Sequence, residues 1–363
     1  MKKNKNYVDL KDQPVPEGQH LLEVDDLKMY FHTEDGVVRA VDGVSYTLDR
    51  GETLGVVGES GSGKSVTAMT IMGLISMPPG KIEGGDVRYR GRSILEMTEE
   101  EMQHIRGNDI AMIFQDPMTS LNPVYKIGKQ VGEGLRLHRG YSKQEALKRA
   151  TELLDLVGIP EPEKRVNEYP HQFSGGMRQR VMIAMALACD PDILIADEPT
   201  TALDVTIQAQ IIELMQEMQE KNGNAIIMIT HDLGVVADMA DKIMVMYAGR
   251  PVEFGTADEI FYESRHPYTW GLIRSIPEQA IDEKKPLTPI HGNPPSLMNL
   301  PEGCVFSPRC PYATDKCRKQ RPERFVMESG HYSACHYSGD PEFLKNAPET
   351  SRTRKDSKKG GEA

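Results

Sequence analysis

Hydrophobic residues alternate along this chain between short continuous runs and stretches with helical spacing. Apolar runs that fit buried strands occupy Thr53–Val57, Asp109–Phe114, Ile193–Ala196, Ala225–Thr230 and Lys242–Tyr247. Ser142–Val157 instead repeats apolar residues at helical spacing. Short buried runs separated by helices predict an α/β fold. The mostly helical stretch from 121 to 185 predicts an insertion between strands.

Several segments depart from this pattern. Residues 1–20 are polar, and 276–303 are rich in proline and resemble a linker. Residues 351–363 are rich in Lys, Arg, Gly and Ser, which is typical of disorder. We therefore expect a flexible leader over 1–20, a main domain over 21–255 with a helical subdomain at about 118–186, a C-terminal domain over 256–340 and a disordered tail over 341–363.

Composition narrows the functional classes. The formal net charge of −11 over 363 residues argues against nucleic acid as the main partner. No apolar run approaches the roughly 18 residues that a membrane-spanning helix needs. The basic start of the chain lacks the apolar stretch of a signal peptide, so we expect the protein in the cytosol.

A phosphate-binding loop is spelled by residues 58–65, Gly-Glu-Ser-Gly-Ser-Gly-Lys-Ser, between an expected strand and an expected helix at Val66–Ile75. Glycines let backbone N–H groups approach a phosphate chain, and the helix N-terminus adds positive charge. Lys64 can reach the β- and γ-phosphates, and the Ser65 hydroxyl can bind Mg²⁺. The residues expected to bind the nucleotide here are Gly58, Ser60, Gly61, Ser62, Gly63, Lys64, Ser65 and Val66.

Two further motifs fit the same chemistry. A buried strand ends in Asp197-Glu198, where one carboxylate can hold Mg²⁺ and the next can orient or deprotonate water. Acidic strand ends are also common on protein surfaces, but the phosphate loop makes catalysis the better explanation. Ser174-Gly175-Gly176 at an expected helix start could bind an anion, although alone such a run is usually only a capped turn.

In this order, and followed by His231, these motifs resemble those of ATP-binding cassette (ABC) ATPases over residues 21 to about 255. The resemblance implies a P-loop α/β core with a helical subdomain, here followed by a small Cys-rich C-terminal domain. It implies the following roles: Gln115 senses Mg²⁺ and faces the membrane partner, Asp197 holds Mg²⁺, Glu198 is catalytic, His231 contacts the γ-phosphate, Phe31 or its neighbour Tyr30 stacks on adenine, and the loop Ala202-Leu203-Asp204 crosses a dimer interface.

The signature departs from the family pattern at Phe173, which replaces leucine, and at Met177, which replaces glutamine. Because Ser174, Gly175 and Gly176 keep the groups that face the phosphates, we expect function to survive. In this family the signature of one chain completes the nucleotide site of another, so a dimer is implied. A monomeric P-loop kinase would not need the signature and would leave His231 without a role.

Three runs resemble a narrower group, the ATPases of oligopeptide, dipeptide and nickel importers. These runs are 115–123, 200–210 and His266-Pro267-Tyr268-Thr269. The Phe-Ser-Gly-Gly-Met variant resembles the D-type subunit, which pairs with a different, F-type ATPase. The resemblance implies two integral-membrane permeases, an extracytoplasmic peptide-binding protein and a peripheral place on the cytoplasmic face of the membrane. Rival functions are a nickel or other small-solute importer, a soluble cassette acting on DNA or ribosomes, and a redox- or metal-sensing regulator.

Four of the five cysteines, Cys304, Cys310, Cys317 and Cys335, gather near the C-terminus. In a reducing compartment such clustering favours metal or redox chemistry. Their gaps lack the two-to-four-residue ligand pairs usual for structural zinc, whereas a [4Fe–4S] cluster tolerates wide spacing. The D-type resemblance suggests the cluster, with zinc as the alternative. Packing as reduced thiols fits the fifth cysteine, Cys189, better.

Overall fold

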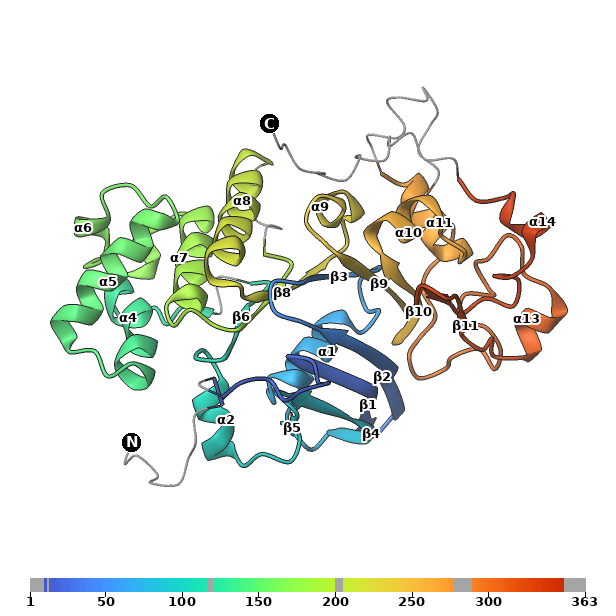
Figure 1. Cartoon of the computed structure of the whole chain (residues 1–363), viewed down its shortest axis with the longest axis horizontal. Coiled ribbons are helices and arrows are strands. Elements are labelled where there is room, and N and C mark those ends of the chain that lie inside the picture. The colour runs from blue at the N-terminus through green and yellow to red at the C-terminus, as the bar shows by residue number, and fades with distance from the viewer. Residues whose placement is uncertain (1–9, 12, 117–119, 200–204, 277–288, 349–363) are drawn as a thin grey trace. The chain divides into compact units, whose positions relative to one another are not determined.

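The computed structural model describes residues 10–348 except 12, 117–119, 200–204 and 277–288 (Figure 1). The chain forms two compact units, each described here by itself. Unit 1 contains Met1–His32, Val41–Leu54 and Ser65–Ile229, and unit 2 contains Thr33–Ala40, Gly55–Lys64 and Thr230–Ala363. Strand β3 (Thr53–Val57) therefore begins in unit 1 and ends in unit 2.

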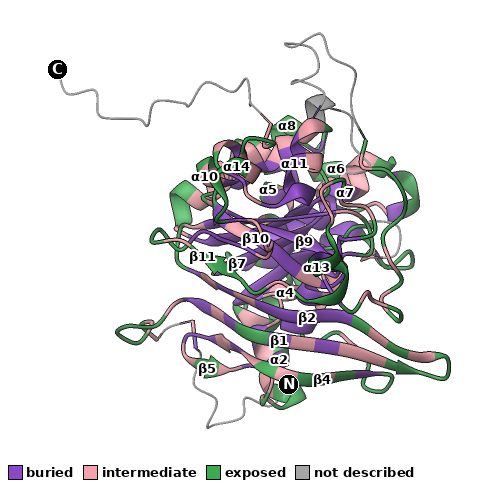
Figure 2. Ribbon diagram, turned by 90° about the vertical axis from the view of Figure 1, so that its right-hand side faces the viewer, coloured by how far each residue is buried: buried purple, intermediate pink, exposed green. Residues whose placement is uncertain are grey.

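A four-stranded sheet in the order β2-β1-β4-β5 forms the N-terminal part of the fold, with β1 antiparallel to β4 and β4 antiparallel to β5. Its strands are β1 (Leu22–Thr33), β2 (Gly36–Leu48), β4 (Gly80–Tyr89) and β5 (Arg92–Ser93). Buried and exposed positions mix along β1 and β4 because one face of each strand packs inward (Figure 2). An irregular register between Asp25 and Lys28 interrupts the alternation in β1.

A second group of unit 1 strands is parallel and fully buried. β7 (Ile193–Asp197) pairs with β6 (Ile110–Ile113) on one side and with β8 (Ala225–Thr230) on the other. Every residue of the three strands is buried, as continuous apolar runs predict for parallel strands covered on both faces. Their carboxyl ends meet at one edge, which places the residues that follow β6 and β7 near each other.

The helices of unit 1 include a group that packs around α4, α5 and α7 (Figure 1). α5 begins at a capping box between Ser142 and Glu145, and its buried Ala146, Ala150 and Leu153 lie on one face. The unit 1 helices are α1 (Lys64–Ile71), α2 (Glu99–Ile105), α4 (Ile127–His138), α5 (Lys143–Leu156), α6 (Pro162–Arg165), the 3₁₀ turn η1 (Pro170–Gln172), α7 (Gly175–Leu187) and α8 (Val205–Asn222).

Unit 2 contains an antiparallel sheet in the order β9-β10-β12-β11. A tight turn at Ala248-Gly249 joins β9 to β10, and both turn residues have positive φ, 49° and 80°. The strands are β9 (Lys242–Tyr247), β10 (Arg250–Thr256), β11 (Phe325–Val326) and β12 (Tyr332–Ser333), and the helices are α9 (Leu233–Ala237), α10 (Ala257–Tyr262), α11 (Pro267–Arg274), α13 (Asp315–Lys319) and α14 (Pro341–Leu344).

The apolar runs predicted as strands at 53–57, 193–196, 225–230 and 242–247 are confirmed, and the run at 109–114 is a strand over Ile110–Ile113. The helix expected at Val66–Ile75 instead spans Lys64–Ile71. No helix in the described part of the chain is long and apolar enough to cross a membrane.

Parts of the expected flexible leader and of the expected disordered tail make defined contacts. Within the expected leader, Leu10 is buried and Lys11 Nζ donates to the carbonyl oxygens of Asn108 and Cys189. Within the expected tail, Pro341–Leu344 form α14, because Asp340 caps its first turn and Phe343 packs against other aromatic rings. These described residues are therefore ordered.

Candidate active site

The phosphate loop begins at the end of β3, in unit 2, and requires glycine at two positions. Gly58 has φ +152°, and a Cβ there would lie 2.2 Å from the carbonyl oxygen of Met246. Gly63 has φ +99°, and its Cβ would lie 2.3 Å from the carbonyl oxygen of Ala40. Any larger side chain would push the loop away from this backbone, so the glycines keep the loop tightly folded.

Lys64 closes the loop on itself. Its buried side chain donates from Nζ to the carbonyl oxygens of Gly58, at 2.6 Å, and Glu59, at 3.0 Å. The ammonium charge is therefore held inside the loop, where an anion would meet it. Ser62 is buried, whereas Ser60 and Gly61 are exposed at the loop's outer turn.

Unit 1 brings together Ser65, in the first turn of α1, and Asp197, the last residue of β7. The Ser65 hydroxyl donates to Asp197 Oδ1 at 3.0 Å, and Asp197 is buried. A hydroxyl beside a carboxylate supplies two of the oxygen ligands that Mg²⁺ prefers. This pair fits the magnesium role predicted for both residues. Val66 follows in α1 and is half-buried.

Gln115 and Glu198 form a second pair in unit 1. Gln115 Nε2 donates to Glu198 Oε2 at 2.9 Å, and the backbone N–H of Glu198 donates to the carbonyl oxygen of Ile229, also at 2.9 Å. Glu198 has φ +46°, a conformation that non-glycine residues rarely adopt and that is common at functional sites. Glu198 is half-exposed and directly follows Asp197, which is buried. Two adjacent residues therefore place one carboxylate inside the protein and one at its surface.

His231 directly follows β8 and belongs to unit 2. The hydroxyl of Thr230 accepts the backbone N–H of Asp232, whose carboxylate in turn accepts the backbone N–H of Gly234 at the start of α9. These two bonds shape the turn that presents the exposed imidazole of His231.

The Ser174-Gly175-Gly176 run forms the start of α7 in unit 1. Ser174 is the N-cap, and its hydroxyl accepts the backbone N–H of Met177 at 3.3 Å. Phe173 is buried, whereas Ser174 and Gly175 are exposed, so the ring that replaces leucine points away from the exposed start of the helix. Met177 contributes a backbone N–H, for which its side-chain type is immaterial.

Sequence reasoning missed Gln179 in the same helix. It is buried, and its Nε2 donates to the carbonyl oxygen of Pro199 at 2.6 Å. This bond ties α7 to the residue after Glu198. The available signal was a glutamine just before the apolar run of α7, where a buried polar side chain needs a partner.

The adenine position stays a prediction. Tyr30 Oη donates to Asp42 Oδ1 at 3.0 Å, and this bond fixes the orientation of the Tyr30 ring. The neighbouring Phe31 is half-buried on β1, opposite Gly80 of β4. The loop Ala202-Leu203-Asp204, predicted to cross a dimer interface, lies outside the described residues.

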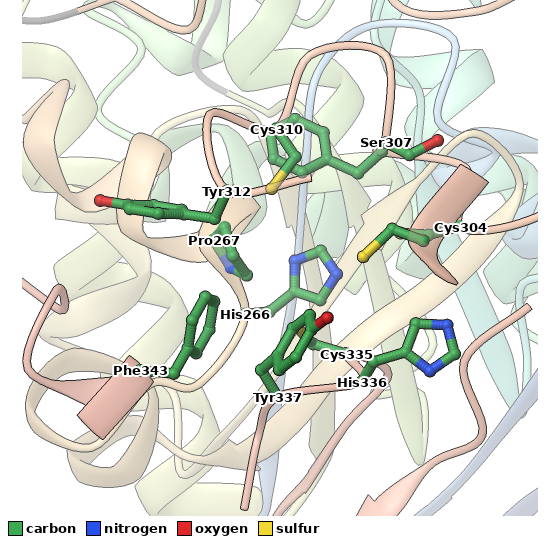
Figure 3. A pocket seen from close by; sticks show the side chains of 12 residues that line it. His266, Pro267, Cys304, Ser307, Cys310, Tyr312, Cys335, His336, Tyr337 and Phe343 are labelled. Atoms are coloured by element: carbon green, nitrogen blue, oxygen red, sulfur yellow. The ribbon is translucent and has the colours of Figure 1, made fainter. Parts of the chain in front are cut away.

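The four clustered cysteines line one pocket in unit 2, together with His266, Phe306 and Phe343 (Figure 3). The sulfurs of Cys304 and Cys310 point into this space in Figure 3. The backbone N–H of Cys304 donates to the carbonyl oxygen of Cys317 at 2.8 Å, which joins the first and third cysteine segments. Cys335 follows β12, which pairs with β10.

Burial disfavours the charged form of two of these thiols, Cys310 and Cys335. Burial, and then the neighbouring cysteines, raise the pKa of Cys310 to about 11 and that of Cys335 to about 12. Within the described residues, no three His, Cys, Asp or Glu side chains are arranged to hold a single metal ion.

Comparison with known proteins matches both halves of the chain. The family model for the ABC transporter covers residues 41–201, and the model for the oligopeptide/dipeptide transporter C-terminal region covers residues 252–317.

Individual relatives match most of the chain. The oligopeptide transport ATP-binding protein OppD of Bacillus subtilis (strain 168) is 59% identical over 312 residues, which cover 86% of this chain and 87% of that protein. The dipeptide transport ATP-binding protein DppD of Escherichia coli (strain K12) is 52% identical over 320 residues, 88% of this chain and 97% of that protein. A solved dimeric structure of the ATP-binding cassette MJ0796 in a post-hydrolysis state, bound to ADP and Pi, matches with a TM-score of 0.60 at 29% identity, over 65% of this chain and 98% of that one.

Proposed function

This chain belongs to the ABC transporter family, in its group of oligopeptide and dipeptide transport ATP-binding proteins, and from that premise we propose that it hydrolyses ATP to power peptide import through a membrane transporter. The observation that carries the proposal is the edge formed by the ends of β6 and β7. There the Ser65–Asp197 pair can bind the metal ion, and the Gln115–Glu198 pair can bind the attacking water.

Binding is assigned to the phosphate loop and the residue after it. Backbone N–H groups of residues 60–65 and the ammonium of Lys64 hold the β- and γ-phosphates, and Ser65 with Asp197 holds Mg²⁺. Bound Mg²⁺ supplies neutralisation of charge on the phosphate oxygens. We place Phe31 against adenine.

Hydrolysis is assigned to Glu198 and its neighbours. The carboxylate accepts a proton from water while the water oxygen bonds to the γ-phosphorus and the bond to ADP breaks. Gln115 orients the carboxylate through its Nε2. We propose that His231, and Ser174 to Gly176 of a second ATPase, stabilise the charge on the transferring phosphoryl group.

The partners follow from the same premise. We propose a heterodimer with an F-type ATPase, contact with two integral-membrane permeases through the segment after Gln115, and supply of peptide by an extracytoplasmic binding protein. The chain then lies peripherally on the cytoplasmic face of the membrane.

Replacing the proposed base tests the assignment. Glu198→Gln keeps the side-chain shape but removes the proton acceptor, so we expect hydrolysis to fall by about 10²–10⁴-fold while ATP still binds. Both quantities are measured on the assembled transporter, by phosphate release and by retention of labelled ATP. Glu213→Gln, on an exposed position of α8, is the matched control and should hydrolyse ATP normally. Normal hydrolysis in Glu198→Gln would refute the assignment.

We also propose that the four-cysteine pocket holds a [4Fe–4S] cluster. The four cysteines line one pocket, which supports a common occupant, and their wide spacing in the chain favours the cluster over a structural zinc ion.

Metal analysis of protein purified without oxygen tests this proposal. We expect about four irons per chain with acid-labile sulfide, lost in Cys335→Ser and kept in Cys189→Ser. Cys189 is the matched control, because it is buried in unit 1 outside the pocket. One zinc per chain, or neither metal, would reject the cluster and leave the ATPase assignment intact.

A further inference from the structure

Glu59, the second residue of the phosphate loop, is held by two residues of the C-terminal region, all within unit 2. The Arg309 guanidinium makes a bidentate pair with its carboxylate, with Nη1–Oε2 at 2.5 Å and Nη2–Oε1 at 2.9 Å. The backbone N–H of Glu59 donates to Tyr268 Oη at 2.9 Å. The loop is therefore fixed both through its side chain and through its backbone.

The Arg309 side chain is held in place by burial and by several hydrogen-bond acceptors. Its side chain is only 4% exposed, against 30% for Glu59. It also donates to the carbonyl oxygens of His291, at 2.9 Å, and Ile290, at 3.1 Å, and to Tyr247 Oη at 3.3 Å. A guanidinium with this many fixed acceptors has little freedom, so its fork is already oriented for the carboxylate.

The tyrosine is equally fixed. Tyr268 is fully buried in α11, and its ring lies 4.6 Å from the Tyr247 ring and 5.3 Å from the Phe306 ring, centroid to centroid. His266 starts this helix, and its Nδ1 accepts the backbone N–H of Tyr268. The motif His266-Pro267-Tyr268 thus places a hydroxyl against the phosphate loop.

The same segments line the four-cysteine pocket. Arg309 directly precedes Cys310, and the backbone N–H groups of both donate to the carbonyl oxygen of Phe306 at 3.0 Å. His266, Pro267 and Phe306 also line that pocket. A change in the pocket would therefore act on the groups that hold Glu59.

We propose that Arg309 and Tyr268 are positioning residues for ATP, which hold Glu59 so that the phosphate loop keeps its nucleotide-binding form. Lys64 Nζ bonds to the carbonyl oxygens of Gly58 and Glu59, so a shift of Glu59 moves the acceptors that centre the ammonium. Affinity for ATP then depends on the C-terminal region. The inference rests on the proposed ATPase function.

The test measures MgATP affinity of the full-length chain by equilibrium dialysis, in the Glu198→Gln background so that ATP is not consumed. Arg309→Met and Glu59→Gln should each weaken affinity by about tenfold, the size expected for a charge-assisted pair. The double variant should be no weaker than either single one, because both remove the same interaction. Arg309→Lys, which keeps the charge but not the fork, should restore part of the affinity, and Tyr268→Phe should weaken it through the backbone contact.

Arg265→Met is the matched control. Arg265 Nη1 donates to the carbonyl oxygen of Ser338 in the same unit, so its loss disturbs the C-terminal region without removing a bond to Glu59. The proposal is supported if the control Arg265→Met binds MgATP within twofold of the parent. It also requires that Glu59→Gln keeps the iron and zinc content of the parent. Unchanged affinity in Glu59→Gln, or additive losses in the double variant, overturns it. If the parent itself fails to bind ATP, the proposed function fails instead.

Discussion

At the scale of single residues, Asp192 is the centre of a buried ionic network in unit 1. Its carboxylate accepts from Tyr89 Oη at 2.6 Å, from Arg90 Nη2 at 2.5 Å and from Arg50 Nη2 at 2.7 Å. The Asp192 and Arg90 side chains are 5% and 3% exposed. Burial opposes the charge, but the hydrogen bonds from Tyr89 and Arg90 outweigh it and hold the pKa of Asp192 below its ordinary value.

Replacing this carboxylate should be costly. Asp192→Asn leaves the buried Arg90 charge without its partner, so we expect the free energy of unfolding to fall by about 3–5 kcal/mol. Urea unfolding at neutral pH measures it. Glu152→Gln, which breaks the exposed Arg149–Glu152 pair, should cost less than about 1 kcal/mol. Equal losses of unfolding free energy in Asp192→Asn and Glu152→Gln would show that the buried network stabilises the protein no more than an exposed ion pair does.

The pH dependence of this contribution has a definite sign. The pKa of Asp192 is lowered in the folded state, so the contribution is fully present above the ordinary value of 3.8 and is lost as the pH falls through the lower folded value. The stability gap between the parent and Asp192→Asn should therefore narrow from about pH 7 to about pH 3. A gap that stays constant over this range would contradict the assignment.

At the scale of secondary-structure elements, α7 and α5 both begin at a serine N-cap. Ser174→Ala and Ser142→Ala should each reduce stability by about 1 kcal/mol, because each removes a bond to a free backbone N–H. Only Ser174→Ala should also lower ATP hydrolysis of the assembled dimer, by about tenfold or more, since that start of α7 is the proposed signature. Phosphate release and urea unfolding separate the two effects. Equal rates of ATP hydrolysis in both variants would show that Ser174 only caps the helix and has no role in hydrolysis.

Elements whose pattern is local could be predicted from the sequence. β7 and β8 are apolar at nearly every position, and each was identified within one residue. β1, β2 and β4 were not identified as strands, because their half-exposed residues become regular only through pairing with distant segments. The helical spacing over Ser142–Val157 predicts α5, which spans Lys143–Leu156.

The same division holds for the site. Gly58 to Ser65 and Asp197-Glu198 are contiguous motifs, so local chemistry reveals them. The positive φ of Glu198 and the identity of the Gln179 partner, Pro199, depend on how separate segments meet, so neither follows from the local sequence. The cysteines could be grouped by proximity in the chain, but His266 and Pro267, which reach the same pocket from the start of α11, could not.

At the scale of the whole molecule, the phosphate loop and its holder come from opposite ends of the chain. Glu59 and Arg309 are 250 positions apart. Ribosomes add roughly 5–20 residues per second, so the arginine is synthesised roughly 12–50 s after the glutamate. During translation the loop therefore exists for roughly 12–50 s before its carboxylate can be paired. A chain broken off before residue 309 carries the whole phosphate-loop motif but lacks the guanidinium that pairs with Glu59, so synthesis must pass residue 309 before this pair can form.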